Sequence, residues 1–223
     1  MNKLKMLVIR FKNLINQEEL SFFRGAIIST MENANILFHN HEENKFRYSY
    51  PLIQYKRINK CAAIVCIGEG TETIGEFFSN CNFDVNIGKR KTTLEIASVK
   101  AFQSIVQIWD DLLTYRINKW LPLNQENYLQ YMNLESIVDK YAMLEKILVG
   151  NILSFAKGIG LHIDKQVICK ITDIDDQYII NYKDVNMTAF NAKFKSNISI
   201  PNFAGLGKGV SLGFGTITKN EII

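Results

Sequence analysis

The chain contains few of the residues from which disulfide frameworks and metal sites are built. Its four cysteines are scattered over 223 residues without a C-x-x-C pair, and only three histidines occur. This spacing excludes a disulfide framework, disfavours a structural zinc site and is typical of buried thiols in a reducing compartment. We therefore expect a cytoplasmic protein that needs no metal ion or other cofactor.

Long apolar runs are absent as well. No segment is apolar over the length needed to span a bilayer, and the N-terminus alternates basic residues with short apolar stretches in place of a signal-peptide core. No membrane partner is expected. The hydrophobic content of 47% nevertheless supplies a core large enough for two small domains, and no linker rich in Pro, Gly or Ser separates the two halves.

The net charge of +4 is modest but unevenly distributed along the chain. Residues 1–60 carry a net charge of +5 and residues 193–223 one of +3, whereas residues 61–192 carry −4. If the two ends meet in space, they form one basic surface, whose natural partner is a phosphate backbone.

The hydrophobic periodicity of the first half predicts the order βαββαβ, which is the ferredoxin-like unit. We expect this domain to span residues 1–104. Its expected elements are a strand at Lys5–Phe11, a helix at Leu20–Met31, strands at Tyr48–Asn59 and Cys61–Ile67 joined by a tight Asn59-Lys60 turn, a helix at Ile74–Cys81, and strands at Asn82–Ile87 and Leu94–Ala101 around the basic hairpin Lys89-Arg90-Lys91.

A second domain is expected over residues 105–223. Its first segment, Ile105–Leu121, favours a strand by its aromatic and β-branched residues, although its apolar spacing would also suit a helix. The other expected elements are a long amphipathic helix at Leu134–Phe155 that stops at Gly158 and Gly160, and short β-rich runs over Val167–Thr218 with turns at Asp175-Asp176 and Asn202.

The segment GLGKGVSLGFG, Gly205–Gly215, has five glycines in eleven positions. A backbone with so few side chains can approach another backbone or a phosphate closely. A nucleotide-binding P-loop is excluded, because Asn202 and Gly209 stand where that motif requires Gly and Ser or Thr, and the spacing does not fit a dinucleotide-binding turn. Lys208 and Ser211 are the candidate phosphate contacts, together with backbone N–H groups. The alternative is that the glycines serve tight interdomain packing alone.

Two of the three histidines form the motif His39-x-His41. On an extended segment, residues two apart face the same side, so both imidazoles can reach one site. Near neutral pH one imidazole can accept a proton while the other donates one, as RNA cleavage by attack of a 2′-hydroxyl requires. The alternative is a feature of a surface loop without catalytic meaning.

The segment Lys45–Arg57, KFRYSYPLIQYKR, combines four cations with four aromatic residues and contains no acid. Cations for phosphates and aromatic faces for bases are what single-stranded or hairpin RNA requires. An ordinary amphipathic strand with packed tyrosines and solvated charges explains the pattern equally well. Within this segment, Lys56 is the candidate for stabilising transition-state charge or for positioning a phosphate.

Both motifs carry a family resemblance. The glycine segment resembles the G-x-G-x-x-x-x-x-G-x-G loop of the repeat-associated RNA-binding superfamily of CRISPR systems, and His39–Arg57 resembles the signature of the Cas6b group of CRISPR endoribonucleases. The resemblance covers essentially the whole chain. It implies an α+β fold of two ferredoxin-like domains in tandem, the second one degenerate. One departure is Leu212, where many relatives carry a basic residue.

The resemblance implies binding to the repeat hairpin of a precursor CRISPR RNA. It also implies metal-independent cleavage to a 2′,3′-cyclic phosphate and a 5′-hydroxyl. In the Cas6b group a His pair and a downstream Tyr act in catalysis, and the candidate catalytic residues here are His39, His41, Tyr48 and Lys56. The candidate RNA contacts are Arg47, Tyr50, Arg57, Gly205, Gly207, Lys208, Gly209, Ser211, Gly213 and Gly215, with the hairpin Lys89-Arg90-Lys91 as a secondary surface.

Two other functions stay open on the sequence alone. One is a non-catalytic RNA-binding CRISPR-associated protein of the same fold, and the other is a protein that binds a different anion. The sequence also leaves open whether the protein works as a monomer or a homodimer, and whether it joins a CRISPR effector complex.

Overall fold

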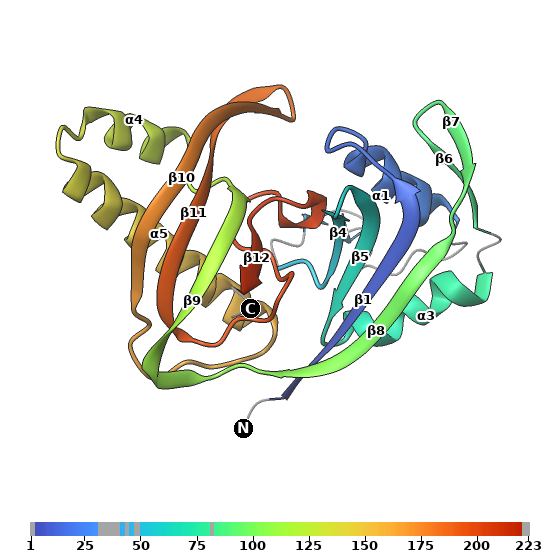
Figure 1. Ribbon diagram of the computed structural model, residues 1–223, viewed down its shortest axis with the longest axis horizontal. Coiled ribbons are helices and arrows are strands. Elements are labelled where there is room, and N and C mark those ends of the chain that lie inside the picture. The colour runs from blue at the N-terminus through green and yellow to red at the C-terminus, as the bar shows by residue number, and fades with distance from the viewer. Residues whose placement is uncertain (1–2, 31–40, 43–44, 47–49, 81–82, 220–223) are drawn as a thin grey trace. The chain divides into compact units, whose positions relative to one another are not determined.

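A computed structural model describes residues 3–30, 41–42, 45–46, 50–80 and 83–219 (Figure 1). The chain divides into two compact units. The first, called the N-terminal unit, contains Lys3–Ser104 together with Ser211–Gly213. The second, called the C-terminal unit, contains Ile105–Val210 and the residues from Phe214 onward.

The N-terminal unit is built on a four-stranded sheet with the strand order β4-β5-β1-β8. The order βαββαβ predicted from periodicity is confirmed, and it gives a ferredoxin-like unit. Its elements are β1 (Lys3–Leu14), α1 (Leu20–Ser29), β4 (Ile53–Ile58), β5 (Cys61–Ile67), α3 (Gly70–Asn80) and β8 (Ile96–Ile105), with the short hairpins β2–β3 (His41–Glu42 and Lys45–Phe46) and β6–β7 (Asp84–Ile87 and Arg90–Thr93) between them.

Aromatic side chains hold the helices of this unit on one face of its sheet. Phe23 of α1 packs edge-on against Phe11 of β1 and Tyr55 of β4, with ring centroids 5.9 and 5.8 Å apart. Phe77 of α3 is buried in the same core. The strand predicted at Tyr48–Asn59 begins only at Ile53, two residues after Pro51, which cannot donate a ladder hydrogen bond.

The predicted turn at Asn59-Lys60 is confirmed. Both residues have positive φ, 51° and 66°, as a tight two-residue hairpin between β4 and β5 requires. Asn59 suits this geometry because its short polar side chain tolerates the left-handed region. The turn therefore fixes the register of the edge strand β4.

The C-terminal unit repeats this arrangement with the strand order β10-β11-β9-β12. Its elements are β9 (Ile108–Trp120), α4 (Gln125–Asn133), α5 (Ile137–Gly158), β10 (Cys169–Tyr182), β11 (Val185–Ile198), the 3₁₀ helix η1 (Val210–Leu212) and β12 (Thr216–Lys219). The strand predicted at Ile105–Leu121 is confirmed as β9. The connection from β11 to β12, where a ferredoxin-like unit carries its second helix, contains only η1 among the described residues, so the predicted degeneracy of this unit is also confirmed.

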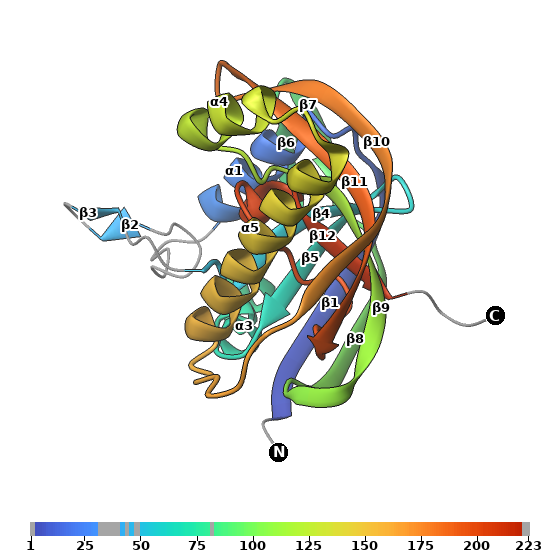
Figure 2. The same ribbon diagram turned by 90° about the vertical axis from the view of Figure 1, so that its left-hand side faces the viewer.

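Helix α5 covers one face of this sheet and runs alongside β10 and β11 (Figures 1 and 2). Leu144, Leu148 and Ile152 recur at helical spacing on its buried face. No helix within the described residues combines the length and apolarity that crossing a membrane requires.

The long helix predicted for this unit is confirmed as α5, which ends at Gly158, but its predicted start and one predicted turn were wrong. The helix predicted from Leu134 begins at Ile137, capped by Ser136, because Leu134 ends a separate helix, α4, whose polar sequence gave no apolar stripe. The turn predicted at Asp175-Asp176 is a bulge inside β10, and the chain reverses instead at residues 183–184. Asp175 forms ion pairs with Lys193 on the adjacent strand β11 and with Arg116 on β9, the next strand of the sheet, so an acidic pair here indicates cross-strand pairing and not a reversal.

Candidate functional site

Strand β4 carries Lys56 into a buried position. Its side chain is only 1% exposed and lies on the face of the sheet opposite Tyr55, which packs in the helix-facing core. Burial lowers the pKa of Lys56 to about 7 from an ordinary 10.5, because desolvation penalises the charged ammonium group. Lys56 is therefore balanced between its neutral and charged forms near neutral pH.

Two other predicted site residues lie on or beside β4. The hydroxyl oxygen of Tyr50 accepts a hydrogen bond of 2.8 Å from Nε2 of Gln54, which also donates to the carbonyl of Pro51. Arg57 is exposed, and its Nε donates to the carbonyl oxygen of Ile15 at 2.7 Å. Tyr50, Lys56 and Arg57 thus lie on one strand and its approach, but Lys56 and Arg57 are consecutive residues and point to opposite faces of the sheet.

A second cation, Arg10, lies in the same row of the sheet as Lys56, and the sequence did not predict this arrangement. In the register of β1, β5 and β4, Ala63 of β5 pairs with Arg10 on one side and with Lys56 on the other. Arg10, Ala63 and Lys56 therefore form one row across three strands. The alternation of β1, with Ile9 and Phe11 in the core, was the signal that places Arg10 on this face.

The predicted catalytic and RNA-binding residues upstream of β4 are less completely described. His39, Arg47 and Tyr48 lie outside the described residues. The backbone of His41 is described, in β2, where it pairs with Phe46 of β3. The grouping of the His pair and Tyr48 with Lys56 therefore stays a prediction. Within the described residues, no three or more His, Cys, Asp or Glu side chains are grouped so as to hold a metal ion.

The glycine segment is packed tightly in the C-terminal unit at Gly207 and Gly215. A Cβ atom on Gly207 would lie 2.9 Å from Nε1 of Trp120 and 3.0 Å from Oδ1 of Asn151. One on Gly215 would overlap the carbonyl oxygen of Leu206, and both glycines have positive φ, 89° and 61°. Close packing inside one unit is therefore one reason for these glycines, beside any role in binding.

Lys208 stands on the exposed side of the segment. Its Nζ lies 5.8 Å from the ring centroid of Tyr182, and that ring meets Phe214 edge-on at 5.3 Å. A Cβ on Gly209 would lie 2.8 Å from Phe214 and 3.0 Å from Tyr182. Gly209 therefore gives room for the two rings that support Lys208.

Ser211 and Gly213 belong to the N-terminal unit. A Cβ on Gly213 would lie 2.9 Å from Cδ1 of Leu20 and 3.3 Å from the carbonyl oxygen of Tyr55. Next to it, the carbonyl of Leu212 accepts a hydrogen bond of 3.2 Å from Nε2 of Gln17. This places one glycine of the segment against β4, at the residue before Lys56.

Comparison with known proteins assigns the family. The models of the Cas6b N-terminal domain and the Cas6b C-terminal domain match residues 2–104 and 107–220. The chain belongs to the Cas6b family. This confirms the resemblance inferred from the two sequence motifs.

Solved Cas6b structures have the same fold. A crystal structure of Cas6b is similar with a TM-score of 0.89 and 30% identity, over 98% of this chain and 100% of that one. A second, described as the CRISPR RNA processing endoribonuclease Cas6b, has a TM-score of 0.73 and 28% identity over the same shares. A curated relative, the uncharacterized protein MJ0978 of Methanocaldococcus jannaschii, is 35% identical over 113 residues, which are 50% of this chain and 76% of the relative.

Proposed function

We propose that this Cas6b protein is an endoribonuclease that cuts precursor CRISPR RNA within its repeats. The observation that supports this best is the Cas6b match over both domains in a chain that keeps the His39-x-His41 motif. The similarity to a solved CRISPR RNA processing endoribonuclease over 98% of the chain supports the same substrate class. The proposed site of this activity is the cytoplasm.

The proposed reaction is a transesterification without a metal ion. The 2′-oxygen of the nucleotide before the cut attacks the adjacent phosphorus and gives its proton to one imidazole of the pair His39 and His41. The bond from phosphorus to the 5′-oxygen breaks, and the other imidazole donates the proton that this oxygen takes up. The products are a 2′,3′-cyclic phosphate and a 5′-hydroxyl. Tyr48 completes this set by family resemblance.

Lys56 is the proposed cation for the charge that develops on the phosphate oxygens. Its buried ammonium group would act in a low-dielectric environment, where electrostatic stabilisation is strong. A phosphate nearby favours the protonated form and so raises the pKa of Lys56. Substrate binding would thus complete the protonation of Lys56, which is only partly protonated near neutral pH in the free protein.

RNA is proposed to contact both the glycine segment, Gly205–Gly215, and the basic segment Lys45–Arg57. The phosphates would be contacted by Lys208, Ser211 and the backbone of Gly205, Gly207, Gly209, Gly213 and Gly215. The RNA strand near the cut would be contacted by Arg47, Tyr50 and Arg57. The packing of Gly213 against Tyr55 favours this assignment, because it joins one glycine of the segment to the strand of Lys56.

The test is cleavage of a labelled repeat RNA in EDTA by the wild type and by His39→Ala, His41→Ala and His162→Ala. His162 matches no motif and serves as the control histidine. We expect one cut by the wild type and by His162→Ala, and loss of that cut in at least one of the other two while RNA binding remains.

Other outcomes separate the alternatives. Strict dependence on Mg²⁺ would overturn the proposed mechanism, and tight binding without a cut by any variant would favour the non-catalytic RNA-binding protein. Failure to bind repeat RNA would leave only binding of another anion. Light scattering of the free and RNA-bound protein distinguishes a monomer from a homodimer.

A further inference from the structure

A basic pocket lies on the N-terminal unit, outside the glycine segment. It has a volume of about 440 Å³ and forms where the end of β1, the turn between β4 and β5, and the β6–β7 hairpin meet. Arg57, Lys60 and Arg90 line it, together with one carboxylate, Glu19. Three cations from two separate hairpins thus face one small volume.

The backbone of a single residue, Ile15, positions two of these cations. Its N–H donates to the carbonyl oxygen of Lys60 at 3.0 Å, and its carbonyl accepts the Nε hydrogen bond of Arg57 at 2.7 Å. Ile15 follows a register shift between Arg10 and Leu14, where β1 departs from β5. The irregular end of β1 therefore fixes both the turn and the guanidinium group.

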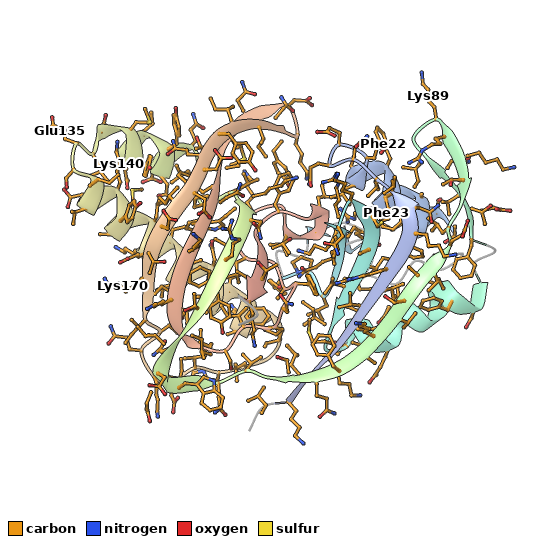
Figure 3. All side chains as sticks on the ribbon, in the orientation of Figure 1. Phe22, Phe23, Lys89, Glu135, Lys140 and Lys170 are labelled. Atoms are coloured by element: carbon orange, nitrogen blue, oxygen red, sulfur yellow. The ribbon has the colours of Figure 1, made fainter. Side chains whose placement is uncertain are left out.

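Glu19 positions the third cation. One carboxylate oxygen accepts from the N–H of Asn16 at 2.8 Å, and the other pairs with Arg90 at 3.1 Å. Figure 3 shows Lys89, the neighbour of Arg90, at the tip of the same hairpin. Since Glu19 is committed to Arg90, it leaves Arg57 and Lys60 without a carboxylate partner among the described residues.

The pocket also has an apolar wall. Leu14 lines it and leaves 65% of its surface exposed, so an apolar side chain is accessible beside the three cations. A ligand that combines an anion with a flat or apolar body would cover Leu14 while its oxygens meet the guanidinium and ammonium groups. A nucleotide unit of an RNA strand has both parts.

We propose that this pocket binds one nucleotide of single-stranded RNA, with its phosphate held by Arg57, Lys60 and Arg90 and its ribose and base against Leu14. The inference rests on the proposed function for its substrate class, and it adds a phosphate site that contains neither the His pair nor the glycine segment. Arg57, already a proposed RNA contact, becomes one of three groups around a single phosphate. The bound strand would thus be anchored at the irregular end of β1 as well as at the glycine segment.

The experiment measures binding of a 2′-O-methyl repeat RNA, which lacks the attacking hydroxyl and cannot be cut, over a series of salt concentrations. The test variant is Lys60→Asn with Arg90→Gln, because Asn adopts the positive φ of the turn readily. The control variant, Lys146→Gln with Lys157→Gln, removes two exposed lysines from α5. Urea unfolding of both variants checks that the fold is intact.

We expect the test variant to bind about tenfold more weakly than the wild type at 0.1 M salt. The slope of log K against log salt should fall by about 0.7, the value for one phosphate contact on a single strand. The control variant should match the wild type. A test variant that is folded and binds with the wild-type affinity and slope would overturn the pocket assignment.

Cleavage of the unmodified RNA, measured alongside, separates the two proposals. If the wild type binds but does not cut, the endoribonuclease proposal fails, whereas the affinity difference still decides the pocket. If the wild type does not bind repeat RNA at all, both proposals are overturned. If the control variant lowered the slope of log K against log salt as much as the test variant does, then the general charge of the protein, and not the pocket, would govern binding, and the pocket assignment would be overturned.

Discussion

The indole N–H of Trp120 donates a hydrogen bond of 2.9 Å to Oδ1 of Asn151, and Gly207 lies directly against both groups. Trp120 ends β9, Asn151 lies in the middle of α5, and Gly207 belongs to the glycine segment. This hydrogen bond therefore joins the sheet to the helix in the C-terminal unit, and the glycine segment packs against it. The absence of a side chain at Gly207 is what allows the three to meet.

Asn151→Ala should destabilise the protein by about 1–3 kcal/mol, because it leaves the fully buried Trp120 N–H without its acceptor. Urea unfolding measures the loss. The matched control is Asn133→Ala at the exposed end of α4, which should change stability by less than about 0.5 kcal/mol. Equal midpoints for the two variants would show that the hydrogen bond contributes nothing.

Gly215→Ala should destabilise the protein by more than about 1 kcal/mol. The new Cβ would overlap the carbonyl oxygen of Leu206 at a backbone φ of 61°, so contact and conformation both oppose it. Gly150→Ala in α5 should do the opposite and stabilise by about 0.5–1 kcal/mol, since nothing lies within 4 Å of its Cβ and alanine favours a helix. Thermal or urea unfolding measures the change in stability of each variant. If Gly215→Ala and Gly150→Ala changed the stability in the same direction, this explanation would be contradicted.

Lys56→Met should change how stability depends on pH. The folded-state pKa of Lys56 is lowered to about 7 from 10.5, so between these values the unfolded chain holds a proton that the folded chain has released. The stability of the wild type therefore rises with pH across this window, and the full penalty of burying a charge applies below it. We expect Lys56→Met to be the more stable protein at pH 6.5 and to lose that advantage by pH 9.5.

The measurement is the difference in unfolding free energy between the two proteins at each pH, so that other titrating groups cancel. A difference that stays constant between pH 6.5 and 9.5 would show that the pKa of Lys56 is not lowered.

Cys66 and Cys169 should resist alkylation in the native protein. Burial raises the pKa of both thiols, that of Cys169 to about 11, so little thiolate is present at pH 8 and access is closed. Cys61 is partly exposed and should react first of these three thiols, which are the ones within the described residues. Mass spectrometry of peptides labelled before and after unfolding checks this order, and early labelling of Cys66 would contradict the buried position described for it.

The first half of the fold could be predicted because its signals are local. Apolar spacing in α1 and α3, a run of buried residues in β5 and the Asn59-Lys60 turn each act within a few residues. The second half depends on more distant partners. The pair Asp175-Asp176 resembles a turn in sequence, but Asp175 stays inside β10 because its carboxylate pairs with Arg116 and Lys193 on two other strands.

The candidate site could be predicted as a list of residues but not as an arrangement. Nothing in the alternation of β4 distinguishes a solvated Lys56 from a buried one, because its burial depends on what covers the second face of the sheet. The packing of Gly213 against Tyr55 joins positions 158 residues apart, and no local pattern announces such a contact. Arg10 was overlooked because its row with Lys56 exists only in the strand register.

The assignment of Ser211–Gly213 to the N-terminal unit has an evolutionary consequence. A chimera that exchanged the two halves between relatives at residue 104 would separate the N-terminal unit from Leu212 and Gly213, which its Gln17 and Leu20 contact. We therefore expect changes at the start of α1 to be accompanied by compensating changes near residue 213, more than a hundred residues beyond the apparent domain boundary.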